Sequence, residues 1–325
     1  MLRTRLFQSF AALILLFGVL SAWFGVSVIR QRVVTEAQSR VRLDLSSAWS
    51  VYGAKLHEIE TVVKLAASKQ LVSDVCGDER WDDAEAASRL ESLRRQFGLD
   101  FLSLVGPNGA VQLRTAPPYA RGDPRAHDPL IAAALAGQAA SGTQLLSGME
   151  LRTEAEGLGE RAFLELEDTP RARATSKTAE SRGMVMMAAE PVRYRAQVVG
   201  ALYGGVLVNR NNLFIDQLQH VIYGDESYHA MAMGTATVFL HDSRVVTTVR
   251  KGNGNRAIGT RASKEVADQV LDNGRSWIGR AFVVNQWYLT AYEAIRDPDQ
   301  QIIGMLYVGI LEQPFRELGE SIVWR

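Results

Sequence analysis

The chain has 325 residues, of which 47% are apolar, and its 36 basic residues balance 36 acidic ones. This length fits two modest domains with connecting helices, and the apolar content is enough to build two hydrophobic cores. The balanced and scattered charge excludes a basic face for nucleic acid. The single cysteine, Cys76, excludes an internal disulfide and a thiolate metal cluster.

The first predicted element is a membrane-spanning helix over residues 10–29. Its sequence, FAALILLFGVLSAWFGVSVI, contains no charged residue, and about 20 apolar residues are what a helix needs to cross a bilayer. Arg3 and Arg5 precede this run, which places residues 1–9 in the cytoplasm and the bulk of the chain outside. A cleaved signal peptide is the alternative interpretation, but it would have a shorter apolar region and a small-residue cleavage site.

Residues 30–72 are predicted to continue outward as one long helix. The segment contains no proline, and its apolar residues recur at intervals of three or four, which draws one apolar stripe along a helix. The stripe can pack against the chain's own domains or form the seam of a dimer, and both can hold at different heights. A second helix is predicted from Asp83 to Phe97. The residues of the stripe are Val41, Leu45, Ala48, Tyr52, Leu56, Ile59, Val63 and Ala66.

The remainder of the chain repeats one order of elements twice. Two short apolar runs around turn residues, typical of a hairpin, are followed by a short helix and three strand-like runs. Each copy predicts a mixed unit with an antiparallel sheet, so the fold class is α+β. The copies end on similar phrases, whose Tyr203 and Tyr307 are expected to pack in the core rather than contact a ligand. The matched runs are residues 101–115, 183–193 and 200–207 (GALYGGVL) in the first copy, and 236–250, 286–296 and 304–311 (GMLYVGIL) in the second.

The first copy carries an insertion relative to the second. The spacing between matched glycines is longer in the first copy, and the extra residues must lie between Gly142 and Gly183. We place this insert at about residues 148–182. It contains the polar run ELEDTPRARATSKTAESRG, which predicts an exposed segment. The segment is either a flap over the pocket of the first module or a passive loop.

Residues 31–315 resemble a double Cache extracytoplasmic sensor region. The second copy, from GTATVFLHDSRVV through NQWYLTAYEAIRDPDQQIIGMLYVGIL, is similar to the Cache 3 and Cache 2 fusion family of bacterial sensor histidine kinases and chemoreceptors. The resemblance implies two stacked PAS-like modules on a long helix, followed by a second membrane helix and a cytoplasmic output. The implied organisation is a cytoplasmic N-terminus (1–9), a membrane helix (10–29), a stalk and dimer helix (30–72), a membrane-distal module (73–215), a membrane-proximal module (216–315) and the start of an exit helix (316–325).

No segment of the chain has the pattern of a catalytic site. The sequence lacks a GxSxG nucleophile turn, an HExxH zinc pair and a GxxxxGK phosphate loop. The five histidines are far apart and none is near the cysteine, so no metal or other cofactor is expected. We expect no enzymatic activity from these residues, and any histidine kinase activity would belong to an output domain. Three functions remain: a ligand-binding receptor, a periplasmic protein-interaction or structural module without a small ligand, and an exported enzyme with a dispersed site.

The ligand site is predicted in the second copy. In the carboxylate-sensing Cache domains that this copy resembles, an Arg of the hairpin is followed three residues later by a His, and a later strand adds a second Arg. Here Arg244 matches the first Arg, Thr247 stands where the His would be, and Thr290 stands near the position of the second Arg. The resemblance therefore favours a singly charged or neutral organic ligand over a dicarboxylate. The predicted contacts are Arg244, Thr247, Arg280, Phe282, Trp287, Thr290 and Tyr292.

The receptor implied by the resemblance is a homodimer in the bacterial inner membrane. Its single N-terminal span would hold the sensor region in the periplasm or outside the cell. The expected partners are a small organic ligand, with carboxylates as the candidate class, and the membrane; nucleic acid is not expected.

Overall fold

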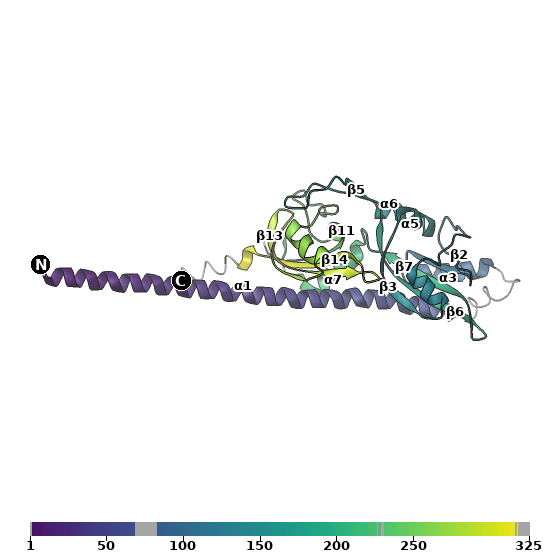
Figure 1. Cartoon of the computed structure of the whole chain (residues 1–325), viewed down its shortest axis with the longest axis horizontal. Helices are drawn as coiled ribbons and strands as arrows, with labels where there is room; N and C mark the ends of the chain where they lie inside the picture. The colour runs from purple at the N-terminus through teal and green to yellow at the C-terminus, as the bar shows by residue number, and fades with distance from the viewer. Residues whose placement is uncertain (1, 69–82, 226, 229–230, 316, 318–325) are drawn as a thin grey trace.

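The computed structural model describes residues 2–68, 83–225, 227–228, 231–315 and 317. It has one long helix, α1 (Leu2–Ala67), and two five-stranded antiparallel sheets that lie one after the other along the C-terminal part of that helix (Figure 1). The predicted α+β class, with antiparallel sheets and a long N-terminal helix, is confirmed. The end of the predicted stalk, residues 69–72, and nearly all of the predicted exit helix, residues 316–325, lie outside the described residues.

The first sheet lies at the far end of α1 from its N-terminus, and we call this sheet and its covering helices the distal module (Figure 1). Its strand order is β2-β1-β7-β6-β3. The helix predicted from Asp83 to Phe97 is confirmed as α3 (Asp83–Gln96). A second helix, α4 (Pro129–Leu135), begins after Asp128, whose carboxylate accepts hydrogen bonds from two backbone N–H groups of the first turn. The strands are β1 (Phe101–Val105), β2 (Val111–Arg114), β3 (Ala140–Leu146), β6 (Gly183–Tyr194) and β7 (Gln197–Leu207).

The second sheet repeats this arrangement closer to the N-terminus of α1, and we call it and its covering segments the proximal module. Its strand order is β11-β10-β14-β13-β12. The repeated phrases form the central strands β7 and β14, where Gly304 has no room for a side chain because a Cβ would lie 1.9 Å from the carbonyl oxygen of Phe239. The elements are α7 (Asn212–Tyr223), β8 (Ser227–Tyr228), β9 (Met231–Ala232), β10 (Gly234–Leu240), β11 (Ser243–Thr247), α8 (Lys264–Ala267), the π-helical turn η1 (Asp268–Asp272), β12 (Trp277–Val283), β13 (Gln286–Arg296) and β14 (Ile302–Leu311).

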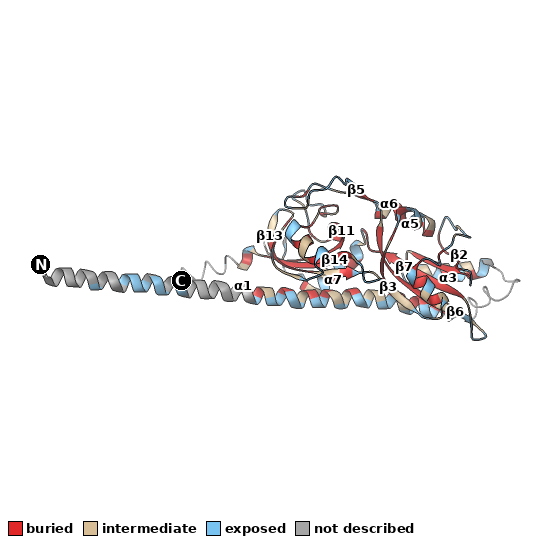
Figure 2. Cartoon of the chain, viewed as in Figure 1, coloured by how far each residue is buried: buried red, intermediate tan, exposed pale blue. Residues whose placement is uncertain are grey.

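Helix α1 buries its apolar stripe against both sheets. Every residue of the predicted stripe is buried except Leu56, which is half-buried, and all of them join one hydrophobic cluster with side chains of the two sheets (Figure 2). The Trp49 Nε1 donates to Glu293 of β13 at 2.8 Å, and one turn later the Tyr52 hydroxyl shares a 2.8 Å hydrogen bond with Thr143 of β3. The stripe therefore packs within the chain, and the prediction that it forms a dimer seam is wrong for these positions.

The other face of each sheet carries its own core. In the distal module this face packs against α4 and the helices of the insert, and in the proximal module against α8, η1 and the loop before them. Each module is thus a sheet between α1 and a layer of short helices and loops. Within the residues that the structure describes, no helix qualifies by length and apolar character as a membrane span.

The insert lies between β3 and β6, whereas residues 284–285 alone join β12 and β13. It contains α5 (Gly148–Glu154), α6 (Leu158–Ala162), β4 (Leu164–Glu165) and β5 (Ala179–Glu180). Between β4 and β5, residues 166–173 run across to the proximal module, and we call them the strap. The prediction of a flap over the distal pocket is wrong for the strap, because its contacts are with the other module.

Backbone and side-chain hydrogen bonds hold the strap to the loop before α8. The Glu167 N–H donates to the Gly259 carbonyl at 3.0 Å, and the Arg261 N–H donates to the Thr169 hydroxyl at 3.0 Å. Further along, Arg173 forms ion pairs with Asp268 and Asp272, each at 2.6 Å. The strap is therefore a structural link between the two modules.

Candidate functional site

The predicted ligand contacts divide between the two faces of the proximal sheet. Residues paired across neighbouring strands share a face, and the register pairs Thr237 with Thr247 and with Tyr307, and Tyr307 with Tyr292. This row lies on the face away from α1. The residues on that face are Arg244, Thr247, Thr290 and Tyr292, whereas Arg280, Phe282 and Trp287 alternate onto the opposite face.

Arg244 is the buried cation of this face. Arg244 is 1% exposed. Its Nη1 donates to the Thr260 hydroxyl at 2.9 Å and to the Arg261 carbonyl at 3.2 Å. Its Nε is buried without a hydrogen-bond partner, and no carboxylate among the described residues lies within ion-pair distance. An unpaired buried charge is costly to a fold, so this guanidinium presents unmet capacity for an anion.

Aromatic rings surround Arg244 on the same face. Its guanidinium carbon lies 4.8 Å from the centroid of the Phe239 ring. Burial lowers the pKa of the Arg244 guanidinium, and the neighbouring Tyr292, Tyr307 and Tyr288 oppose that shift. Burial raises the pKa of both Tyr288 and Tyr292 to about 12, so their hydroxyls remain protonated donors at neutral pH. Neither of these two hydroxyls has a hydrogen-bond partner among the described residues.

The two predicted threonines already have partners. The hydroxyls of Thr247 and Thr237 share a hydrogen bond of 2.5 Å, and the Thr290 hydroxyl donates to the Gly279 carbonyl at 2.8 Å. The structure thus brings Thr247 and Thr290 to the same face as Arg244 but uses their hydroxyls inside the sheet. The free donors beside Arg244 are instead the hydroxyls of Tyr288 and Tyr292. Of these two residues, Tyr288 was not among the contacts predicted from the sequence.

The remaining three predicted residues form a separate stack with the strap. Arg280 is an exposed residue whose Nε donates to Glu312 at 2.7 Å, and its guanidinium carbon lies 3.8 Å from the centroid of the Trp287 ring. Phe282 packs edge-on to Trp287 with centroids 5.4 Å apart. The guanidinium of Arg171, from the strap, lies 4.9 Å from the Trp287 centroid. These residues belong to the contact between modules, away from Arg244.

A pocket of about 560 Å³ opens at one end of the proximal module. Tyr288 and Thr235 line it, and the Thr235 hydroxyl is hydrogen-bonded to the Tyr307 hydroxyl at 3.0 Å. Tyr288 therefore belongs both to this pocket and to the cluster around Arg244. Among the described residues, no three His, Cys, Asp or Glu side chains gather in a way that could hold a metal ion.

The distal module holds a polar cluster that sequence analysis missed. The carboxylate of Glu154, from α5, accepts hydrogen bonds from Arg114 Nε and Nη2, both at 3.1 Å, from the Ser103 hydroxyl at 3.1 Å and from the Tyr203 hydroxyl at 2.8 Å. The side chains of Arg114 and Glu154 are only 1% and 0% exposed. Arg114 also donates to Asp123 at 2.6 and 2.8 Å, and these hydrogen bonds lower the pKa of the Asp123 carboxyl. Tyr203 is buried in the core, as predicted, and its hydroxyl donates to Glu154 of this cluster.

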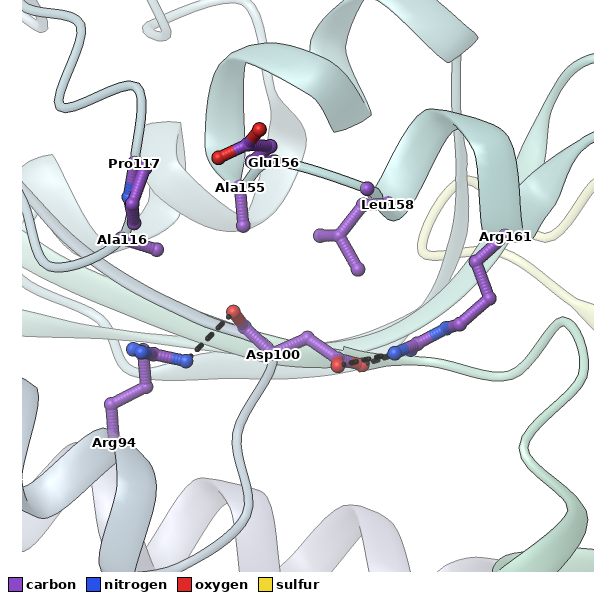
Figure 3. Close-up of a pocket in the computed structure, with 9 residues that line it drawn as sticks. Arg94, Asp100, Ala116, Pro117, Ala155, Glu156, Leu158 and Arg161 are labelled. Carbon is purple, nitrogen blue, oxygen red and sulfur yellow. Dashed lines mark hydrogen bonds and ion pairs between the residues drawn. The ribbon is translucent and has the colours of Figure 1, made fainter.

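A second pocket, of about 530 Å³, opens beside this cluster (Figure 3). Two arginines approach Asp100 in it. Arg161 donates to the Asp100 carboxylate at 2.8 and 2.5 Å, and Arg94 donates to the Asp100 carbonyl at 3.3 Å. The Leu207 N–H also donates to the Asp100 carboxylate, at 2.7 Å. Figure 3 shows both arginines bonded to Asp100, Arg161 through the carboxylate and Arg94 through the backbone carbonyl.

Residues 206–322 match the family model described as single cache domain 3. The proximal module is similar to a single Cache domain. This match confirms the resemblance to Cache sensor modules that the sequence indicated, and it covers α7 and every strand of the proximal sheet. A comparison with curated proteins found no match.

The chain is partly similar to several solved sensor domains. They include the sensor domain of the histidine kinase DctB of Vibrio cholerae, 12% identical over 86% of this chain and 98% of that one, with a TM-score of 0.47. The periplasmic domain of LuxQ of Vibrio cholerae is 13% identical over 83% of this chain and 98% of that one, with a TM-score of 0.43. The sensory domain of the chemoreceptor Tlp3 of Campylobacter jejuni was solved with isoleucine bound. It is 9% identical over 90% of this chain and 98% of that one, with a TM-score of 0.46.

Proposed function

We propose that the chain is the extracytoplasmic sensor part of a membrane-anchored receptor that binds a small organic ligand in the proximal module. Ligand binding would shift the arrangement of the modules on α1 and so inform a cytoplasmic output of the histidine-kinase or chemotaxis type. The observation that carries the proposal is Arg244, a buried guanidinium with a free Nε and no carboxylate partner among the described residues. The similarity of the same module to a Cache domain supports it.

The groups around Arg244 suit a ligand with one carboxylate. A single buried cation balances one negative charge, and a charge-assisted hydrogen bond from a guanidinium is stronger than a neutral one. The hydroxyls of Tyr288 and Tyr292 can donate further bonds, and the rings of Phe239 and Tyr307 supply an apolar wall. Because Thr247 and Thr290 are bonded within the sheet, we no longer assign them direct contact with the ligand.

The membrane anchor in this proposal is the uncharged run of residues 10–29. It is supported by its sequence and by the exposure of the large apolar side chains that the structure describes in the N-terminal part of α1. Large apolar surfaces of this kind mark contact with a membrane or with another protein. The described large apolar side chains there are 54–72% exposed: Phe10, Leu15, Leu16, Phe17, Leu20 and Phe24.

The test is a thermal-shift screen of the wild type and of Arg244→Met against small mono- and dicarboxylates. A ligand that binds only the folded state must raise the Tm, so we expect a monocarboxylate to raise the Tm of the wild type and not that of the variant. Without ligand, Arg244→Met should melt at or above the wild-type Tm, because methionine removes a buried unpaired charge and keeps most of the volume.

Arg280→Met is the matched control. It removes an exposed arginine from the opposite face of the same sheet, so its ligand response should equal that of the wild type. A ligand response that survives in Arg244→Met but is lost in Arg280→Met would move the site to the stack beside the strap. If no small molecule raises the wild-type Tm, the protein-interaction function becomes the better explanation.

A further inference from the structure

The carboxylate of Glu154 is held in the way that a small carboxylate ligand would be. Its oxygens accept from three side chains on three strands: Ser103 of β1, Arg114 of β2 and Tyr203 of β7. Arg114 approaches with two bonds of 3.1 Å each, the paired geometry that guanidinium and carboxylate groups favour. The buried Nε of Arg125 lies 3.8 Å from the same carboxylate and has no hydrogen-bond partner.

The donors belong to the sheet, whereas the carboxylate belongs to the insert. Ser103 pairs with both Arg114 and Tyr203 in the register of the sheet, so the donors form one continuous row across β2, β1 and β7. Glu154 is the last residue of α5, in a segment that has no counterpart in the proximal module. The sheet therefore provides a binding surface, and a separate element supplies the group that fills it.

The proximal sheet repeats this row without an occupant from an insert. Thr237 pairs with Thr247 on β11 and with Tyr307 on β14, the same relation that joins β2, β1 and β7 in the distal sheet. The row lies near Arg244, which has no carboxylate partner among the described residues. The two modules thus differ: the distal row binds an internal carboxylate, whereas in the proximal row Thr247 stands at the register position of Arg114. The cation near the proximal row is Arg244, one position further along the same face.

We propose that Ser103, Arg114 and Tyr203 form a second carboxylate-binding site, which Glu154 occupies as an internal ligand. The class of free ligand that this site would take is a small monocarboxylate, because it already binds one carboxylate with a full set of donors. In the intact chain Glu154 excludes such ligands, since a tethered group competes at an effective concentration that a dilute solute does not reach. This proposal does not depend on the function of Arg244.

Removing the Glu154 side chain opens the site to carboxylates in solution. Glu154→Ala removes one of the two carboxylates that Arg114 contacts, and it leaves the buried hydroxyls of Ser103 and Tyr203 without their acceptor. This variant should therefore melt below the wild type. The space that it creates fits formate, which should rebind to the donors. With about 50 mM sodium formate we expect the Tm of the variant to rise roughly 2–4 °C above its value in the same concentration of sodium chloride. Any rise that formate gives the wild type through the Arg244 site is the baseline, and the rise of Glu154→Ala should exceed this baseline by that amount.

Two further variants make the result specific. Glu156→Ala removes an exposed carboxylate two residues away, on the wall of the pocket in Figure 3, and should respond to formate no more than the wild type does. The double variant with Glu154→Ala and Arg114→Met should also fall back to the wild-type response. The proposal is overturned if Glu154→Ala responds no more to formate than Glu156→Ala does, or if the response persists without the Arg114 guanidinium.

Refolding provides the same test if Glu154→Ala does not stay folded in chloride. The variant would be refolded from urea in formate and in chloride side by side. If the site binds formate, the folded state is stabilised, so the yield of folded protein should be larger in formate than in chloride. Equal yields in the two salts contradict the proposal.

Discussion

His241 occupies the turn between β10 and β11, where burial lowers the pKa of its imidazole. Arg182 and Lys177 lower this pKa further, and Glu180 and Asp242 oppose them. The unfolded chain takes up this proton near pH 6.5, whereas the folded protein resists it until a lower pH. The contribution of the neutral His241 to stability is therefore fully present above about pH 6.5, and it is lost as the pH falls below that value.

We expect the Tm of the wild type to fall more than that of His241→Asn between about pH 7.5 and about pH 5.5. Asparagine cannot take up the proton, and it tolerates the left-handed backbone, since His241 has a φ of 48°. Scanning calorimetry across this range checks the expectation. His57→Asn, which changes an exposed histidine on α1, should follow the wild-type curve, and a wild-type curve parallel to that of His241→Asn would contradict the role of His241.

At the scale of residues, the family resemblance predicted part of the candidate site. Of its seven contacts, Arg244, Thr247, Thr290 and Tyr292 lie on one face of the proximal sheet, and the other three lie on the opposite face. It could not predict that the Thr290 hydroxyl is bonded to a backbone carbonyl. Glu154 was missed because its partners come from strands far away in the sequence, although one signal was present: it lies three residues after Leu151 on the buried side of α5.

At the scale of elements, the strap positions the loop that holds Arg244. The Arg244 guanidinium donates to Thr260 and to the Arg261 carbonyl, and the Arg261 N–H donates to Thr169 of the strap. The strap thus supports the acceptors of the arginine that we assign to ligand binding. Its polar composition favoured an exposed loop, because contact with a segment of the other module leaves no periodic pattern in the sequence.

Replacing residues 166–173 by a glycine and serine linker of equal length should loosen this loop. We expect faster amide exchange in residues 257–264, while the strands of the distal sheet keep their protection. Hydrogen-exchange mass spectrometry measures both regions in one experiment. Unchanged exchange in residues 257–264 would show that the strap does not support them, and loss of protection throughout the distal sheet would show that it belongs to the distal core.

A smaller change at the same element separates its two kinds of contact. Thr169→Val removes a hydroxyl that accepts from the partly buried N–H of Arg261, and we expect a loss of about 1–3 kcal/mol in the free energy of unfolding. Arg173→Ala breaks ion pairs that remain partly exposed, so its loss should stay below about 1 kcal/mol. Urea unfolding measures both, and equal losses would mean that the ion pairs contribute more than surface pairs usually do.

At the scale of the whole molecule, the orientation of α1 restricts how two chains can associate. Leu45 and Ile59 face the sheets, so they cannot meet a partner, whereas Leu43 is 69% exposed. If the receptor is a homodimer through α1, Leu43→Cys and Ser50→Cys should crosslink in isolated membranes, and Leu45→Cys should not. Crosslinking through Leu45→Cys would contradict the packing of α1, and absence of the chain from the membrane fraction would contradict the anchor.

The continuity of α1 also fixes the rotational phase of one module relative to the other. Trp49 and Tyr52, one turn apart, bond to different sheets, and the same stripe serves both cores. Inserting a single residue between the two contact regions would rotate the rest of the helix by about 100° and turn the stripe away from one sheet, whereas about seven residues would restore the alignment after two turns. The separation of the modules can therefore change only in steps of the helical repeat, and any rotation of α1 about its own axis acts on both sheets at once.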